Sequence, residues 1–204
     1  MSKEFEEHRR WFSDFKRKLK ENEDVKSEFI NAIDELIREY DTALYENRFV
    51  VGGAIEYIFV ALVRSLGFSA QHLGTTEKRG DLKIGELEFS LKTSFTGRGE
   101  IRLINKLGRD VDISWGEPTI FIISGLGIIY ADPDLLREKI IDKGDALTLD
   151  VEKIQNLASN SPEFFVKIQI PRKPTKIESR HTASFDVAVA ILKKIGSKRL
   201  INYL

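Results

Sequence analysis

Hydrophobic residues recur at helical spacing in two segments near the start of the chain, 4–20 and 25–45. Apolar side chains three or four positions apart form one stripe on a helix, so each segment predicts an amphipathic helix. Residues 22–24 offer helix-capping side chains between them. We therefore expect a helical hairpin over 1–48 that packs on the main domain or contributes to a dimer interface.

The next segment, 54–66, is apolar on nearly every side, with Glu56 and Arg64 as its only charges. A helix that is hydrophobic all round is a buried helix, so this segment predicts a central helix that ends at Gly67. Glu56 would then be a carboxylate in an apolar setting.

Short alternating runs follow, typical of strands. Segment 69–73 predicts one strand, and segment 80–94 predicts two more joined by a turn at Gly85. Asp81 opens the first arm of this hairpin and Lys92 lies near the end of the second. Antiparallel pairing about Gly85 would place these two side chains at the same end of the sheet.

The remaining pattern predicts further elements of both kinds. They are helices at 100–107, 134–141, 150–158 and 184–195, and strands at 119–124, 127–131 and 164–170. Because strands and helices are interspersed, we expect an α/β fold with a central mixed β-sheet flanked by helices. No linker interrupts 49–204, which we interpret as a single globular unit behind the helical extension 1–48.

Composition narrows the function classes. A hydrophobic content of 42% excludes a disordered chain. No apolar run is long enough to cross a bilayer, and residues 1–19 are too charged for a secretory signal, so we expect a cytoplasmic protein without a membrane partner. Zero cysteines exclude disulfides and thiolate chemistry, and three histidines without ligand spacing disfavour a histidine-rich metal site. Any metal would be a hard, oxygen-liganded ion.

The charge balance is even, with 32 basic and 32 acidic residues, which argues against indiscriminate coating of nucleic acid. It leaves room for a locally basic cleft. The high charged fraction of 31%, with one methionine and no cysteine, favours a thermophilic source.

Asp81, Lys92 and Glu56 are the candidate catalytic group. A carboxylate beside a lysine on neighbouring strands suits a Mg²⁺-dependent phosphodiesterase, because the acid can hold the metal and the ammonium can lie near the attacking water. The alternative for the first two is a turn aspartate and a surface lysine. Glu56 either serves a function or is an ion-paired or exposed charge near the helix start.

Ser90 and Glu88 share the strand face of Lys92. Ser90 stands two residues before the lysine, where a carboxylate would be most useful, and its hydroxyl can hold a metal-bound water. The missing charge would come from Glu56, Glu88 or Glu100. Glu88 is either a metal ligand or a charge on a solvated strand end.

Asp81 followed by Ser90-Leu91-Lys92, with Glu56 on a preceding helix, resembles the PD-(D/E)xK nuclease superfamily over residues 51–123. Two departures are that Gly80 replaces the usual proline and Ser90 replaces the usual acid. With serine at that position, the motif is similar to that of a subgroup of type II restriction endonucleases.

The resemblance implies a restriction-endonuclease-like fold and a Mg²⁺ site. Glu56 matches the helix glutamate, Asp81 the metal-bridging aspartate and Lys92 the catalytic lysine. Glu100 matches a displaced downstream acid, although it follows Lys92 more closely than the family pattern implies.

Two basic segments are candidate DNA contacts. The first is a stripe on the predicted helix after the lysine strand, made of Arg98, Arg102, Lys106 and Arg109. The second is a loop after the strand at 164–170, with Arg172, Lys173, Lys176 and Arg180. Both could follow phosphates or read base edges, and the alternative is a solvated helix face for the first and a charged surface linker for the second.

These features lead us to expect a Mg²⁺-dependent, sequence-specific endonuclease of the restriction type, acting on double-stranded DNA as a homodimer. One alternative is a repair or junction-resolving nuclease on the same fold. The other is a DNA-binding module that has lost activity, which the serine at position 90 keeps open.

Overall fold

The computed structural model of the chain describes residues 3–40, 45–74, 80–106, 114–172 and 184–204. Its helices are α1 (Glu6–Glu21), α2 (Glu23–Glu39), α3 (Tyr45–Ser65), α4 (Pro133–Leu136), α5 (Val151–Asn160) and α6 (Ser184–Lys194), and short 3-10 turns lie at Lys3–Phe5, Arg137–Lys139, Pro162–Phe164 and Leu200–Tyr203. Its strands are β1 (Ala70–His72), β2 (Leu82–Ile84), β3 (Leu87–Ser94), β4 (Glu100–Asn105), β5 (Thr119–Ile123), β6 (Gly127–Ala131), β7 (Ile140–Asp142), β8 (Ala146–Asp150) and β9 (Phe165–Lys167). The predicted mixed α/β class is confirmed.

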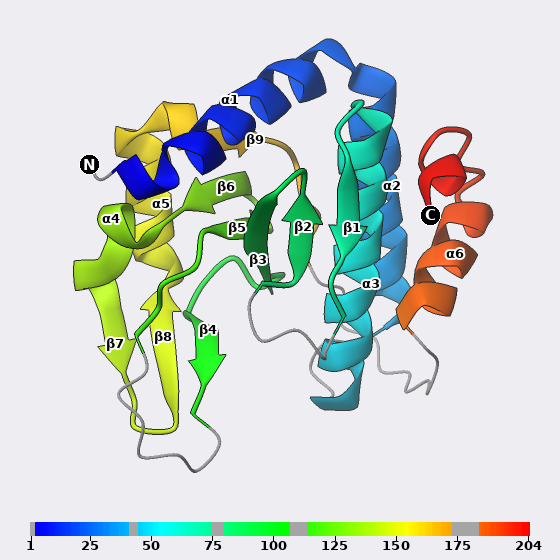
Figure 1. The fold of residues 1–204 in the computed structure, drawn as a ribbon. Coiled ribbons are helices and arrows are strands. Elements are labelled where there is room, and N and C mark those ends of the chain that lie inside the picture. Colours follow the sequence, from blue (N-terminus) through cyan, green and yellow to red (C-terminus); the bar gives the residue numbers. More distant parts are fainter. Residues whose placement is uncertain (1–2, 41–44, 75–79, 107–113, 173–183) are drawn as a thin grey trace.

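The strands form two sheets (Figure 1). The larger has the order β1-β2-β3-β5-β6-β9 and is mixed, because β3 and β5 run parallel while the other neighbours are antiparallel. The smaller is antiparallel, with the order β4-β8-β7. β4 lies between β3 and β5 in the chain, so the crossover that joins these parallel strands contributes to the second sheet.

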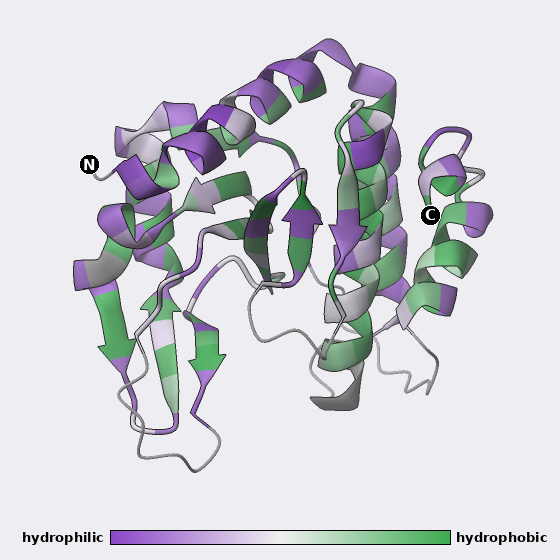
Figure 2. Cartoon of the chain, viewed as in Figure 1, coloured by the Kyte–Doolittle hydropathy of each residue, from purple (hydrophilic) through white to green (hydrophobic). Residues whose placement is uncertain are grey.

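The central strands bury side chains on both faces. In β5, Ile120 and Ile122 join the core cluster formed with α1, α2, α3 and α6, whereas Phe121 and Ile123 join a second cluster with β4, β8 and α5. Strands buried on both sides lose the polar alternation of a half-exposed strand. Figure 2 shows the complementary pattern on the periphery, where much of α1 is hydrophilic.

The N-terminal helices share the main core. Phe12 and Phe15 of α1 and Phe29 of α2 are fully buried in the same cluster as α3 and the sheet. Arg9 of α1 also forms a bidentate ion pair with buried Asp132, at 2.7 and 2.8 Å. The boundary expected between 48 and 49 falls inside α3.

The helix predicted at 100–107 is wrong: this segment contains strand β4, which pairs with β8. Ile101 and Leu103 alternate with exposed neighbours until a register shift between Arg102 and Ile104. The register shift accommodates two successive apolar residues, Leu103 and Ile104, in one strand. In the sequence, Ile101 and Ile104 are also three positions apart, which fits a helical period, so a short window could not separate the two structures.

A smaller correction concerns 134–141. The helix there is only α4, ending at Leu136, and the chain then forms a 3-10 turn and strand β7. The predicted helix at 150–158 corresponds to α5, and the predicted closing helix at 184–195 corresponds to α6. Within the described ranges, none of the helices combines the length and the apolarity that a bilayer span requires.

Candidate active site

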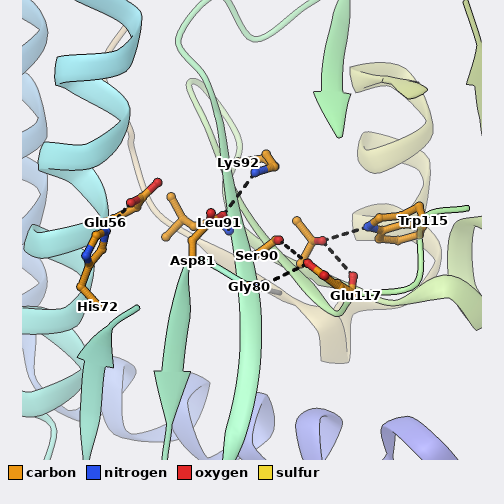
Figure 3. Close-up of polar contacts among 10 residues, drawn as sticks. Glu56, His72, Gly80, Asp81, Ser90, Leu91, Lys92, Trp115 and Glu117 are labelled. Atoms are coloured by element: carbon orange, nitrogen blue, oxygen red, sulfur yellow. Dashed lines mark hydrogen bonds and ion pairs between the residues drawn. The ribbon is translucent and has the colours of Figure 1, made fainter. Parts of the chain in front are cut away.

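Asp81 and Lys92 are brought together in the larger sheet. The ladder between β2 and β3 reaches Leu82 and Phe89, and Asp81 lies just beyond it. Its Oδ2 atom accepts a hydrogen bond from the Leu91 backbone N–H at 2.7 Å and from Lys92 Nζ at 3.2 Å (Figure 3). The carboxylate therefore replaces the next rung of the ladder and fixes the ammonium beside it.

Glu56 meets a histidine that the sequence analysis assigned no role. Glu56 of α3 and His72 of β1 lie 2.6 Å apart between Oε2 and Nε2, with side chains 20% and 15% exposed. The Gly74 N–H donates to His72 Nδ1 at 3.1 Å. Since Nδ1 accepts, the ring proton belongs on Nε2, where it is donated to Glu56. His72 thereby holds this carboxylate in place.

The hydroxyl of Ser90 is paired with a second residue that sequence reasoning missed, Glu117. Ser90 Oγ donates to Glu117 Oε2 at 2.9 Å, and the Gly80 N–H donates to the same oxygen at 3.2 Å. Ser90 N also bonds the Pro118 carbonyl, which fixes the segment before β5 against β3. A carboxylate thus lies at the position where Ser90 itself lacks one.

These groups form a row across adjacent elements. Figure 3 shows the Glu56–His72 pair on one side of Asp81 and the Ser90–Glu117 pair on the other. Each of the three carboxylates uses one oxygen for the hydrogen bonds given above. The described residues place no hydrogen bond on Asp81 Oδ1, Glu56 Oε1 or Glu117 Oε1. The described part of the chain therefore leaves one oxygen of each of these three carboxylates without a hydrogen bond.

The described residues do not form a metal site made wholly of protein ligands, because no three of their His, Asp or Glu side chains converge closely enough. Mg²⁺ does not need such a cage, because one or two carboxylates suffice when water and substrate phosphate supply the other oxygens. The donor set around Asp81 is all oxygen, which fits a hard cation.

The other two predicted metal ligands have different partners. Glu100 of β4 pairs with Lys143 at 2.8 Å, and that hydrogen bond lowers the pKa of its carboxyl. Glu88 is exposed and lies opposite Lys83 in the ladder. Neither residue is hydrogen-bonded or ion-paired to Asp81 or Lys92 within the described structure.

A hollow of about 270 Å³ borders Glu117 and Gly80 and is also lined by His8, Glu88 and Pro118. Burial lowers the pKa of His8, and its Nδ1 atom is buried without a hydrogen-bond partner among the described residues. The imidazole of His8, whose charged form is disfavoured by burial, therefore forms part of the wall of this hollow, which Glu117 also lines.

The basic stripe expected on a helix is divided: Arg102 lies on β4, Lys106 directly follows this strand, and both are matched by acids. Arg102 pairs with Asp145 at 3.1 Å, and Lys106 pairs with Asp142. These pairs reduce the positive charge that this strand offers to phosphates. Four predicted DNA contacts, Arg109, Lys173, Lys176 and Arg180, lie outside the described residues.

Two other predicted DNA contacts, Arg98 and Arg172, lie at the edge where the parallel strands β3 and β5 end. Ser124 N bonds Ser94 O at 2.9 Å, so the loop after β3 contacts the turn after β5. Arg98 belongs to this loop and is exposed. Gly125 lies in that turn, and a Cβ atom added to it would be 3.4 Å from the guanidinium of Arg172. Arg172 therefore packs against the turn.

Two signals in the sequence could have pointed to the missed residues. Glu117 stands directly before a proline and a β-forming run, and His72 ends the strand that precedes the hairpin. Neither indicates a partner without the three-dimensional arrangement.

Comparisons with protein-family models, with curated proteins and with solved structures found no match to this chain. The arguments about function therefore depend on the site itself.

Proposed function

We propose that this protein is a Mg²⁺-dependent endonuclease of the restriction type that hydrolyses double-stranded DNA. One observation carries the proposal: Lys92 Nζ lies 3.2 Å from Asp81 Oδ2, on neighbouring arms of the hairpin that resembles the PD-(D/E)xK motif. The restriction-endonuclease-like fold is part of the proposal, supported by a buried helix, three antiparallel strands and a strand parallel to the third.

Asp81 and Glu56 are the proposed metal ligands, each through its available oxygen. Asp81 is oriented by the Leu91 N–H and Glu56 by His72, so neither carboxylate has to be ordered when a cation arrives. Bound Mg²⁺ would supply charge neutralisation at the scissile phosphate and a more acidic attacking water.

Lys92 has the second role. Its side chain is only 25% exposed and is aligned by Asp81, which gives the ammonium a fixed direction. In the reaction it would donate a hydrogen bond to the attacking water or to a phosphate oxygen and stabilise the charge that develops there.

Glu117 is our candidate for the acid that the motif lacks at Ser90. It reaches the backbone of Gly80, next to Asp81, and its second oxygen is available. Ser90 orients it as a positioning residue.

DNA would approach the edge that carries Arg98 and Arg172, two residues with no acidic partner in the described ranges. Arginine contacts to phosphates would position the duplex. A homodimer would present two such sites to a palindromic sequence. A cytoplasmic location stays a prediction from the sequence.

A digest of phage DNA tests this function. The purified protein with Mg²⁺ should give discrete fragments with shared end sequences, and EDTA should stop cleavage. Selective cutting of branched DNA would instead indicate a junction-resolving nuclease. Absence of cleavage on linear and branched DNA, with retained DNA binding, would indicate the inactive binding module and contradict the proposal.

A further inference from the structure

A second hollow lies at the opposite edge of the larger sheet from β1 and the Glu56–His72 pair. It has a volume of about 240 Å³ and is bordered by β9, the last strand in the sheet order, together with parts of α1 and α2. Seven residues line it, and four of them are lysines: Lys16, Lys20, Lys26, Pro162, Phe165, Val166 and Lys167.

The positive charge of this hollow is only partly compensated. Lys26 pairs with Glu23 at 2.6 Å, but Lys20 and Lys167 are exposed and have no ion pair with a described residue. Lys16 and Lys20 lie one turn apart on α1, where like charges repel.

Lys16 is held in this position. Its ammonium donates to the Pro162 carbonyl, so the side chain is directed across to the segment that precedes β9. Burial, followed by the charge of Lys20, lowers the pKa of Lys16. A chain with equal numbers of acidic and basic residues therefore gathers four ammonium groups around one hollow.

We infer that this lysine hollow, defined by Lys16, Lys20, Lys26 and Lys167, binds a phosphate group. Lysines are compact point charges with three donors each, which suits a tetrahedral anion approached from several sides. Phe165 and Val166 provide an apolar part of the hollow's wall. The phosphate belongs either to a nucleic-acid backbone or to a free phosphate compound.

The inference goes beyond the proposed nuclease and does not need it. The hollow and the Asp81–Lys92 pair are on different strands and share no lining residue. Binding there would serve to hold a phosphate away from the reacting centre, as an anchor for nucleic acid or as an effector site.

The test uses two double variants of the full chain, matched in charge. Lys20→Gln with Lys167→Gln removes the two exposed ammonium groups of the hollow. Lys193→Gln with Lys198→Gln removes two exposed lysines at and after the end of α6. Both are examined in EDTA, so that no cleavage occurs, by calorimetric titration with inorganic phosphate and by fluorescence anisotropy with a labelled duplex.

We expect the hollow variant to lose at least tenfold in affinity for one of the two probes, and the control to stay within twofold of wild type. If DNA is the ligand, the slope of log K against log salt should fall by about 2 for two lost phosphate contacts. Loss for phosphate alone identifies a free phosphate compound, and loss for DNA identifies a backbone phosphate. Wild-type protein that binds neither probe, or two variants that bind alike, would overturn the inference.

Discussion

Asp81 divides its two carboxylate oxygens between the fold and the proposed chemistry. Oδ2 completes the hairpin through the Leu91 N–H and aligns Lys92, while Oδ1 accepts no hydrogen bond from the described residues. Removing the whole side chain would therefore disturb the strand end as well as the site. Asparagine keeps an acceptor for the Leu91 N–H and removes the charge, so it separates the two roles.

A buried ion pair gives the residue-scale stability prediction. Asp132 accepts two hydrogen bonds from Arg9 and one from the Tyr130 hydroxyl, and its side chain is fully buried. Asp132→Ala leaves a nearly buried guanidinium without its main partner, and we expect a loss of about 3–5 kcal/mol in the free energy of unfolding. Urea denaturation measures it.

The matched control is Asp14→Ala, also on an ion pair made by α1. Asp14 and Arg17 lie 3.0 Å apart with both side chains at least half exposed. Such a pair contributes about 0.2–0.5 kcal/mol. Equal losses for the two variants would show that Asp132 does not tie α1 to the sheet.

At the residue scale the sequence predicts the Asp81–Lys92 pair but not the roles of the neighbouring residues His72 and Glu117. Asp81 and Lys92 followed from hairpin symmetry about Gly85, which is a local property of one short segment. His72 and Glu117 depend on contacts across 16 and 27 residues of chain, to Glu56 and Ser90. No local periodicity encodes such contacts.

Among the elements, β4 shows why pattern alone fails. Its partner β8 begins at Ala146, more than forty positions further along, and the pairing decides that the segment is a strand. The long apolar helix α3 is easier to predict from the sequence, because burial on all sides needs no particular partner. Its start was still misplaced, at Ala54 instead of Tyr45.

Two adjacent glycines in α3 give the element-scale prediction. A Cβ on Gly52 would meet nothing within 4 Å, whereas one on Gly53 would lie 2.5 Å from Ser184 Oγ and 2.8 Å from Ser184 Cβ. Gly52→Ala should stabilise the protein by about 0.5–1 kcal/mol, because alanine loses less backbone entropy in a helix. Gly53→Ala should destabilise it by about 1–3 kcal/mol through overpacking against α6.

Urea unfolding of both variants compares them directly. Ser184→Gly in the Gly53→Ala chain should recover part of the loss, since it removes the clashing Cβ. Two alanine variants of equal stability would mean that α6 does not pack on α3 as described.

For the whole molecule, the even charge balance conceals an uneven distribution. Arg102 on β4 and Lys106 directly after it are matched by acids, whereas Arg98, Arg172 and two lysines of the hollow, Lys20 and Lys167, have no ion pair within the described ranges. The sequence could predict the total charge and the segments that carry it. It could not predict which of these charges the fold would neutralise, because the acids come from distant strands and turns.

The most direct test of the central claim is the Mg²⁺-dependent cleavage rate of Asp81→Asn on DNA that the wild-type protein cuts. Asp145→Asn, an equal change at an exposed acid paired with Arg102, is the control. We predict at least a hundredfold loss for Asp81→Asn, with DNA binding and the unfolding midpoint near wild type, and an unchanged rate for the control. Cleavage by Asp81→Asn at the wild-type rate would contradict the assignment of this carboxylate to the metal.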